Sequence, residues 1–155
     1  MVRWIDGFYG GLVAGVTSAL FYTVVAVAWL HEVTLDGFFA QAAQALPPFH
    51  GAPVSWALVG LGVVLYFALA AAFGIVYALL ASRLRSMWPA PASVAWGLLY
   101  GLLVWWVIND VLVPLTGAVQ AQPLWEGLVG TVIFYGVVLS EMTTVAHRRE
   151  ASAAP

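Results

Sequence analysis

Long apolar stretches alternate with short polar breaks along the whole chain. A helix needs about 20 consecutive apolar residues to cross the ~30 Å hydrocarbon core of a bilayer. Four stretches meet that requirement and contain almost no Lys or Arg: residues 8–30, 56–82, 93–115 and 125–146. The pattern therefore predicts an all-α fold, a four-transmembrane-helix bundle that forms one integral membrane domain over residues 1–155.

The longest non-spanning segment, residues 31–55, contains a shorter helical pattern. Apolar residues recur at helical spacing between Leu35 and Leu46. Asp36 is a candidate N-cap, and Pro47 and Pro48 end the pattern. The segment is too short to span the bilayer. We expect a short interfacial helix in this first outer loop, or a helix packed down onto the mouth of the bundle.

The basic residues indicate the orientation in the membrane. They occur at both ends of the chain and in the connection between the second and third apolar stretches, and the other two connections have none. Because cytoplasmic loops carry an excess of Lys and Arg, we expect both termini and the middle connection to be cytoplasmic. The five basic residues are Arg3, Arg83, Arg85, Arg148 and Arg149.

Composition agrees with a protein embedded in lipid. Hydrophobic residues make up 63% of the chain and charged residues 8%, whereas a soluble domain averages roughly 25% charged residues. The eight Trp suit a protein anchored at two membrane–water interfaces. A net charge of −2 does not favour nucleic acid as a partner, and the absence of Cys excludes disulfides and thiolate chemistry.

Small residues recur every four positions in the predicted spans. Such ridges allow close helix packing in lipid, either within one chain or between copies. We therefore expect a homo-oligomer or a subunit of a larger membrane complex. The ridges comprise Gly7, Gly11, Gly15 and Ala19, then Ala70, Gly74, Ala78 and Ser82, then Gly97 and Gly101, and finally Gly136 and Ser140.

Parts of the sequence suggest an internal repeat. Trp56 with VVLY at 63–66 matches Trp125 with VIFY at 132–135 at a constant offset. Tyr9-Gly10 likewise resembles Tyr100-Gly101. Two tandem hairpins of the same orientation would form a parallel repeat.

Two acidic positions within the apolar stretches are candidate proton or cation sites, because burying an ionisable group in a span is costly. Asp110 and its neighbour Asn109 fall near the outer end of the third stretch, where Pro114 cannot donate to the Asp110 carbonyl. The alternative is a kinked helix end. Glu141 falls within the inner leaflet, and it either pairs with an arginine such as Arg83, Arg85 or Arg148 or stays buried and partly protonated.

Other candidate chemistry is less specific. His31 and His50 lie on the outer side with several carboxylates, but their spacing fits no known metal motif. Trp105 and Trp106 fall mid-span, where they either pack between helices or face a flat ligand such as a quinone or pigment. No motif indicates a catalytic site or a bound cofactor.

The chain resembles the YagU-type family of small bacterial inner-membrane proteins. The resemblance rests on GLVAGVTSAL (11–20), LVPLTG (112–117) and a fourth helix that opens at Trp125 and closes with SEMTTVAHRRE (140–150). It implies a multi-helix fold in the bacterial inner membrane, a loose link to acid tolerance and no catalytic residue. The matched positions are Pro114, Gly117, Trp125, Glu141, Arg148 and Arg149, and the first outer loop of this chain is shorter than in the family.

The sequence thus favours a non-enzymatic membrane protein that acts as an accessory subunit or a self-associating bundle. The alternative is a small channel-like or transporter-like protein that handles protons or cations through Glu141 and Asp110.

Overall fold

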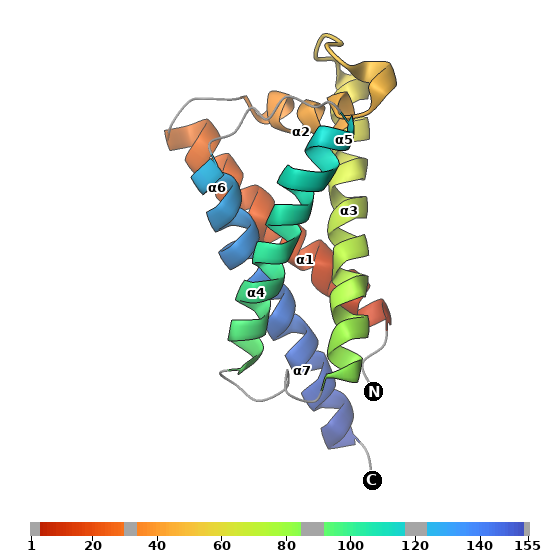
Figure 1. Cartoon of the computed structure of the whole chain (residues 1–155), viewed down its shortest axis with the longest axis vertical. Helices are drawn as coiled ribbons and strands as arrows, with labels where there is room; N and C mark the ends of the chain where they lie inside the picture. The colour runs from red at the N-terminus through yellow and green to blue at the C-terminus, as the bar shows by residue number, and fades with distance from the viewer. Residues whose placement is uncertain (1–3, 30–33, 85–91, 117–123, 154–155) are drawn as a thin grey trace.

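The computed structural model describes residues 4–29, 34–84, 92–116 and 124–153 (Figure 1). Within these ranges every regular element is a helix. Four helices are long and apolar enough to cross a membrane, which confirms the predicted all-helical, multi-pass class. They span Trp4–Val25, Trp56–Arg83, Ala92–Thr116 and Trp125–Arg149.

Three of the four long helices change from α to π geometry along their length. The first span comprises α1 (Trp4–Tyr22) and η1 (Thr23–Trp29). The second is the unbroken helix α3 (Trp56–Arg83). The third comprises α4 (Ala92–Trp106), η4 (Val107–Leu112) and α5 (Val113–Thr116), and the fourth comprises α6 (Leu124–Val129), η5 (Gly130–Val137) and α7 (Val138–Ala153).

A short helix, α2 (Leu35–Gln44), covers one end of the bundle, and a 3-10 turn follows it at Pro47–Phe49 (Figure 1). The N-cap is Thr34, not Asp36 as expected, because the Thr34 side chain accepts the Gly37 N–H at 3.3 Å. The Phe38 ring of α2 is buried against Tyr22 and Tyr66, with ring centroids 5.3 and 5.8 Å away. α2 therefore packs against the end of the bundle through the Phe38 ring.

α1 and α3 approach so closely that their backbones touch. A Cβ atom added at Gly11 would collide with the Ala70 carbonyl, and one added at Gly7 would collide with Gly74. A Cβ added at Gly15 would similarly lie 2.9 Å from the Ala70 Cβ. The three glycines and Ala78 belong to ridges that the sequence singles out, and here they join two helices of one chain.

α4 packs on the fourth span through the same arrangement. A Cβ at Gly97 would meet the Gly136 carbonyl at 2.7 Å and the Ser140 Cβ at 2.8 Å, as Gly7 meets Gly74 and Ala78. A Cβ at Gly101 would meet the Thr131 carbonyl at 2.7 Å. The two hairpins, α1 with α3 and α4 with the fourth span, thus repeat one packing pattern. Gly7 corresponds to Gly97, one position away from the register of Tyr9-Gly10 and Tyr100-Gly101, and Gly74 corresponds to Gly136, seven positions away from the register of Trp56 and Trp125.

The two hairpins differ by one residue along the contact. Four residues separate Ala70 from Gly74 on α3, and five separate Thr131 from Gly136. The longer stretch lies inside η5, and a π turn holds one residue more than an α turn. The ridge glycines are buried within the chain, so they do not supply a surface for contact between copies: Gly7, Gly11, Gly15, Gly74, Gly97, Gly101 and Gly136.

Substitution of Gly11 by Ala should separate α1 from α3, because the new methyl group would meet backbone atoms that have no freedom to move aside. We expect a loss of about 2–3 kcal/mol in unfolding free energy, measured by reversible SDS unfolding in mixed micelles. Gly60→Ala is the matched control, since a Cβ there meets open space and improves helix propensity by up to about 1 kcal/mol. Equal losses at both sites would contradict the close-approach interpretation.

α2 should lose stability in acid. The Thr34 side chain, followed by the Gly37 N–H, lowers the pKa of the exposed Asp36 carboxyl below its ordinary value of 3.8. A lowered pKa means that ionised Asp36 stabilises the folded helix above about pH 3.8, and that this contribution disappears as pH falls through the lower, folded-state value. Protection of the α2 backbone amides from hydrogen exchange should therefore fall in acid, and Asp36→Asn should remove this pH dependence. Unchanged protection in acid would contradict the expectation.

Candidate functional site

Five of the six tyrosines lie inside the bundle instead of at the membrane interfaces, where Tyr is ordinarily enriched. Tyr9, the sixth, is 60% exposed. Four of the inner tyrosines are almost fully buried, and Tyr66 is partly buried. The interior tyrosines are Tyr22, Tyr66, Tyr77, Tyr100 and Tyr135.

Most of these hydroxyls donate to a backbone carbonyl of a different helix. Because a hydrogen-bonding group in hydrocarbon has no water to turn to, each bond satisfies a phenol and joins two helices at once. The carbonyl acceptors are therefore part of the helix-packing surface. The bonds run from Tyr22 to Gly127 (3.2 Å), from Tyr66 to Gly15 (3.1 Å), from Tyr100 to Phe73 (2.6 Å) and from Tyr135 to Ala70 (2.6 Å).

A carboxylate lies buried near the α2 end of this tyrosine set. Glu126, in the first turns of the fourth span, is 0% exposed. The carbonyl of the next residue, Gly127, accepts the Tyr22 hydroxyl at 3.2 Å. The Trp105 indole lies against the next residue, Gly127, whose added Cβ would be 3.2 Å from the indole nitrogen. In the sequence, Glu126 looks like one of several outer acidic residues, and its burial makes it the strongest candidate among them.

A second carboxylate, Glu141, lies level with the opposite end of the bundle. It accepts a hydrogen bond from Ser93 at 3.0 Å, one residue inside the start of α4. The Ser93 carbonyl in turn accepts the buried Ser140 hydroxyl at 2.6 Å. The Glu141 side chain is largely exposed, and within the described residues no ion pair joins it to Arg83 or Arg148. Arg85, the third predicted partner, lies outside the described residues.

The five interior tyrosines lie between these two ends. Ring centroids of Tyr77 and Tyr100 are 4.9 Å apart. The Tyr135 and Tyr100 hydroxyls bond to the carbonyls of Ala70 and Phe73, which lie three residues apart on α3 between Tyr66 and Tyr77. We call this set, Tyr22, Tyr66, Tyr135, Tyr100 and Tyr77, the tyrosine column.

No family model matches the chain, and no curated protein or solved structure is similar to it. The resemblance to the YagU-type family therefore stays a prediction.

The Asn109–Asp110 pair lies apart from the tyrosine column. Both residues belong to η4, and Asp110 is exposed on the bundle surface. The Asn109 amide donates to the Trp105 carbonyl of its own helix at 2.8 Å. Pro114 has no N–H to donate to the carbonyl four or five residues before it. The π turn that precedes Pro114 is the distorted helix end expected from the sequence.

The remaining predicted site residues do not come together. Trp105 is partly buried between helices, whereas Trp106 is exposed, so the two rings do not form one flat surface. His50 is exposed with a ring nitrogen 3.2 Å from the Ala45 carbonyl, and His31 lies outside the described residues. Among the residues that the structure describes, no three His, Asp or Glu side chains gather as a metal site would require.

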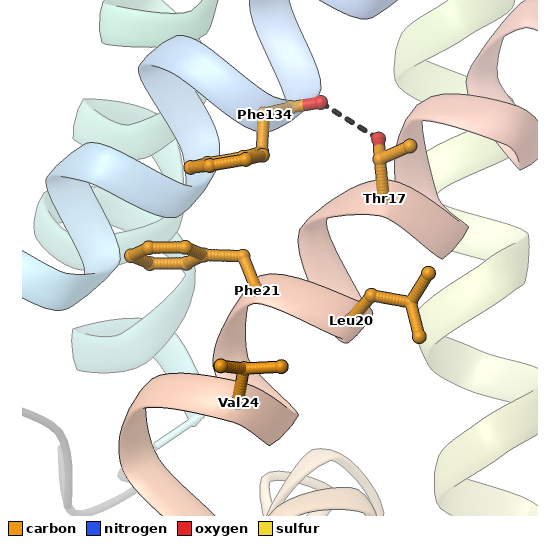
Figure 2. A pocket seen from close by; sticks show the side chains of 5 residues that line it. All are labelled: Thr17, Leu20, Phe21, Val24 and Phe134. Carbon is orange, nitrogen blue, oxygen red and sulfur yellow. Dashed lines mark hydrogen bonds between the residues drawn. The ribbon is translucent and has the colours of Figure 1, made fainter. Parts of the chain in front are cut away.

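An apolar hollow of about 360 Å³ opens between α1 and η5 (Figure 2). The Phe21 and Phe134 rings stack in it at 4.5 Å, and the Thr17 hydroxyl donates to the Phe134 carbonyl at 2.8 Å. Because the five lining residues include no ionisable group, the hollow suits only an apolar molecule. They are Thr17, Leu20, Phe21, Val24 and Phe134.

Hydroxyls of α1 should support the π-helical segment that they contact. Ser18 is buried and donates to the Gly130 carbonyl at 3.1 Å, at the start of η5. Ser18→Ala should lower the unfolding free energy by about 0.5–1.5 kcal/mol, measured by SDS unfolding. Ser82→Ala is the control, because its exposed hydroxyl bonds only within its own helix and its loss should change little. Equal effects would contradict a role for the interhelical bond.

Proposed function

We propose that this chain is a non-enzymatic membrane protein that serves as an accessory subunit, binding another membrane-spanning helix through the outward face of α4. The partner is a second copy of the chain or a different membrane protein. The proposed location is the bacterial inner membrane with both termini cytoplasmic. The distribution of arginines supports that orientation, because Arg83, Arg148 and Arg149 all lie at the end opposite α2.

The interior supports a scaffold more than a catalyst. Its glycines hold backbones in contact, and its hydroxyls bond to helix carbonyls. Because these interior groups already contact one another, we expect a rigid bundle that binds other molecules on its outer surface.

The observation that carries the proposal is the outward face of α4. The span that contains it, Ala92–Thr116, has the smallest share of buried residues among the four. Its exposed side chains recur at helical spacing on one side, so they form a continuous apolar stripe. Because lipid tails are as apolar as leucine, binding at this face depends on van der Waals packing between these side chains and a partner helix that fits between them. The stripe comprises Leu98, Leu99, Leu102, Leu103 and Trp106.

A cation path from Asp110 to Glu141 is less well supported. Both side chains are exposed on the bundle surface, at opposite ends. Among the described residues the buried carboxylate is Glu126 instead.

Crosslinking tests the proposed contact, and the cysteine-free chain makes single-cysteine variants unambiguous. Leu99→Cys, at a position 58% exposed on α4, would carry a maleimide-linked benzophenone and be irradiated in native membranes. We expect a discrete adduct, because a packed partner helix lies within reach of the probe. An adduct of twice the chain mass identifies a second copy, and any other discrete mass identifies a different protein.

Val76→Cys on α3 is the matched control, at a position 47% exposed. It should react with lipid and give no discrete protein adduct. Failure of Leu99→Cys to form an adduct, or equal adducts from both variants, would show that the α4 stripe faces lipid and that the proposal is wrong.

A further inference from the structure

The outward face of the third span includes one carboxylate. Every fourth residue is exposed in a row that runs from α4 through η4 into α5: Leu98, Leu102, Trp106, Asp110 and Pro114. The first three of these belong to the apolar stripe. Within η4 only Asp110 is exposed, while the residues on both sides of it are partly buried. The Asp110 carboxylate therefore lies in line with the stripe, towards the end of the bundle that α2 covers (Figure 1).

The π geometry of η4 keeps Asp110 on this face. An α turn holds 3.6 residues, so a row of four-residue steps drifts round an α-helix. A π turn holds more residues, and the step from Trp106 to Asp110 through η4 therefore reverses part of that drift. The neighbouring Asn109 amide bonds to the Trp105 carbonyl of its own helix. Among the described residues, neither a hydrogen bond nor an ion pair holds the Asp110 carboxylate.

Asp110 lies inside the apolar part of its span and not at the end of it. Residues 111–115 are all apolar, and the helix continues to Thr116, roughly 9 Å beyond Asp110. Leu115 is 77% exposed, so apolar surface extends past the carboxylate. A long Lys or Arg side chain could reach the interface from this depth, but the short Asp side chain is held close to its backbone. An ionised group at such a position ordinarily has a partner of opposite charge.

We propose that the partner bound by the α4 stripe is a different membrane protein, whose spanning helix carries a Lys or Arg near its outer end that pairs with Asp110. The inference rests on the proposed binding of a helix by α4, and it adds the chemistry of that helix. Leucines and Trp106 supply the packing surface. The carboxylate selects which helix binds and at what depth, because opposite charges at one level favour the matching partner over others.

A second copy of this chain does not offer such a group. All five of its basic residues are arginines, and they lie next to the two termini or in the connection that follows α3. Two copies share one orientation in the membrane, so these arginines stay at the end away from Asp110. A twofold contact of α4 with α4 would place equivalent residues together, and the two Asp110 carboxylates would repel. His50 follows the turn after α2, where its ring nitrogen lies 3.2 Å from the Ala45 carbonyl.

Crosslinking in native membranes tests the charge. The protein with benzophenone at Leu99→Cys would be compared with the same protein that also carries Asp110→Asn, which keeps the shape of the side chain and removes its charge. We expect the yield of the adduct to fall by roughly threefold or more, since a polar contact between membrane helices contributes about that much to affinity.

Glu141→Gln is the matched control. It removes another exposed carboxylate, at the opposite end of the bundle, and should leave the yield unchanged. Circular dichroism and gel filtration would establish that each variant is folded, and Asp110→Ser replaces Asp110→Asn if that variant is not.

A charge exchange identifies the group on the partner. Mass spectrometry of the adduct gives the crosslinked helix, which should contain a Lys or Arg near its outer end. Asp110→Arg alone should abolish the adduct, and Asp110→Arg together with Asp at the basic position of the partner should restore it. Pairing of Asp110 with a lipid headgroup would give no such restoration.

The outcomes separate this inference from the proposed function. Absence of a discrete adduct from Leu99→Cys with Asp110 intact would overturn both. An adduct of twice the chain mass, an undiminished yield with folded Asp110→Asn, an equal loss with Glu141→Gln, or no restoration by the exchanged charges would overturn this inference alone and leave the binding of a helix by α4 standing.

Discussion

Backbone contact at glycine is the constraint on which the rest of this structure depends. Lipid tails are as apolar as leucine, so the helices gain little by merely burying apolar side chains against one another. At Gly11 and Gly74, and again at Gly97 and Gly136, the absence of side chains lets two helices touch. Within the α1–α3 contact, the Tyr66 hydroxyl reaches the Gly15 carbonyl. Tyr135 on η5 and Tyr100 on α4 bond to carbonyls of α3, so these two bonds join one glycine-packed pair of helices to the other.

The spans were predictable because each needs only an uninterrupted apolar run and the length of the bilayer. The second helix begins at Trp56 and the fourth at Trp125, where the sequence places them, whereas the first begins at Trp4 and not at Phe8. The predicted N-cap of α2, Asp36, was wrong. Thr34 and Asp36 are both good cap residues, and the local turn decides which of them caps the helix. Whether the glycine ridges join helices of one chain or of two depends on tertiary packing, which a single-span pattern does not contain.

Glu126 and the tyrosine column could not have been found from any one helix. Glu126 is fully buried in the structure, whereas its sequence position beside Trp125 suggests only an interface residue. One signal was present: Tyr66 and Tyr77 lie eleven residues apart, which places two phenols on one face of a span. Tyr100 and Tyr135 bond to that face from other helices, so only the assembled bundle brings these phenols together.

The π-helical segment η5 has a consequence for the history of the two hairpins. One extra residue in a straight α-helix rotates everything beyond it by about 100°, which would turn Gly136 away from Gly97. In η5 the extra residue is absorbed locally, and contacts on both sides of it keep their partners. The insertion is therefore nearly silent in three dimensions, while it shifts the sequence register of one hairpin against the other. A common ancestry of the two halves would be visible in their packing and hidden from any alignment that uses a fixed offset.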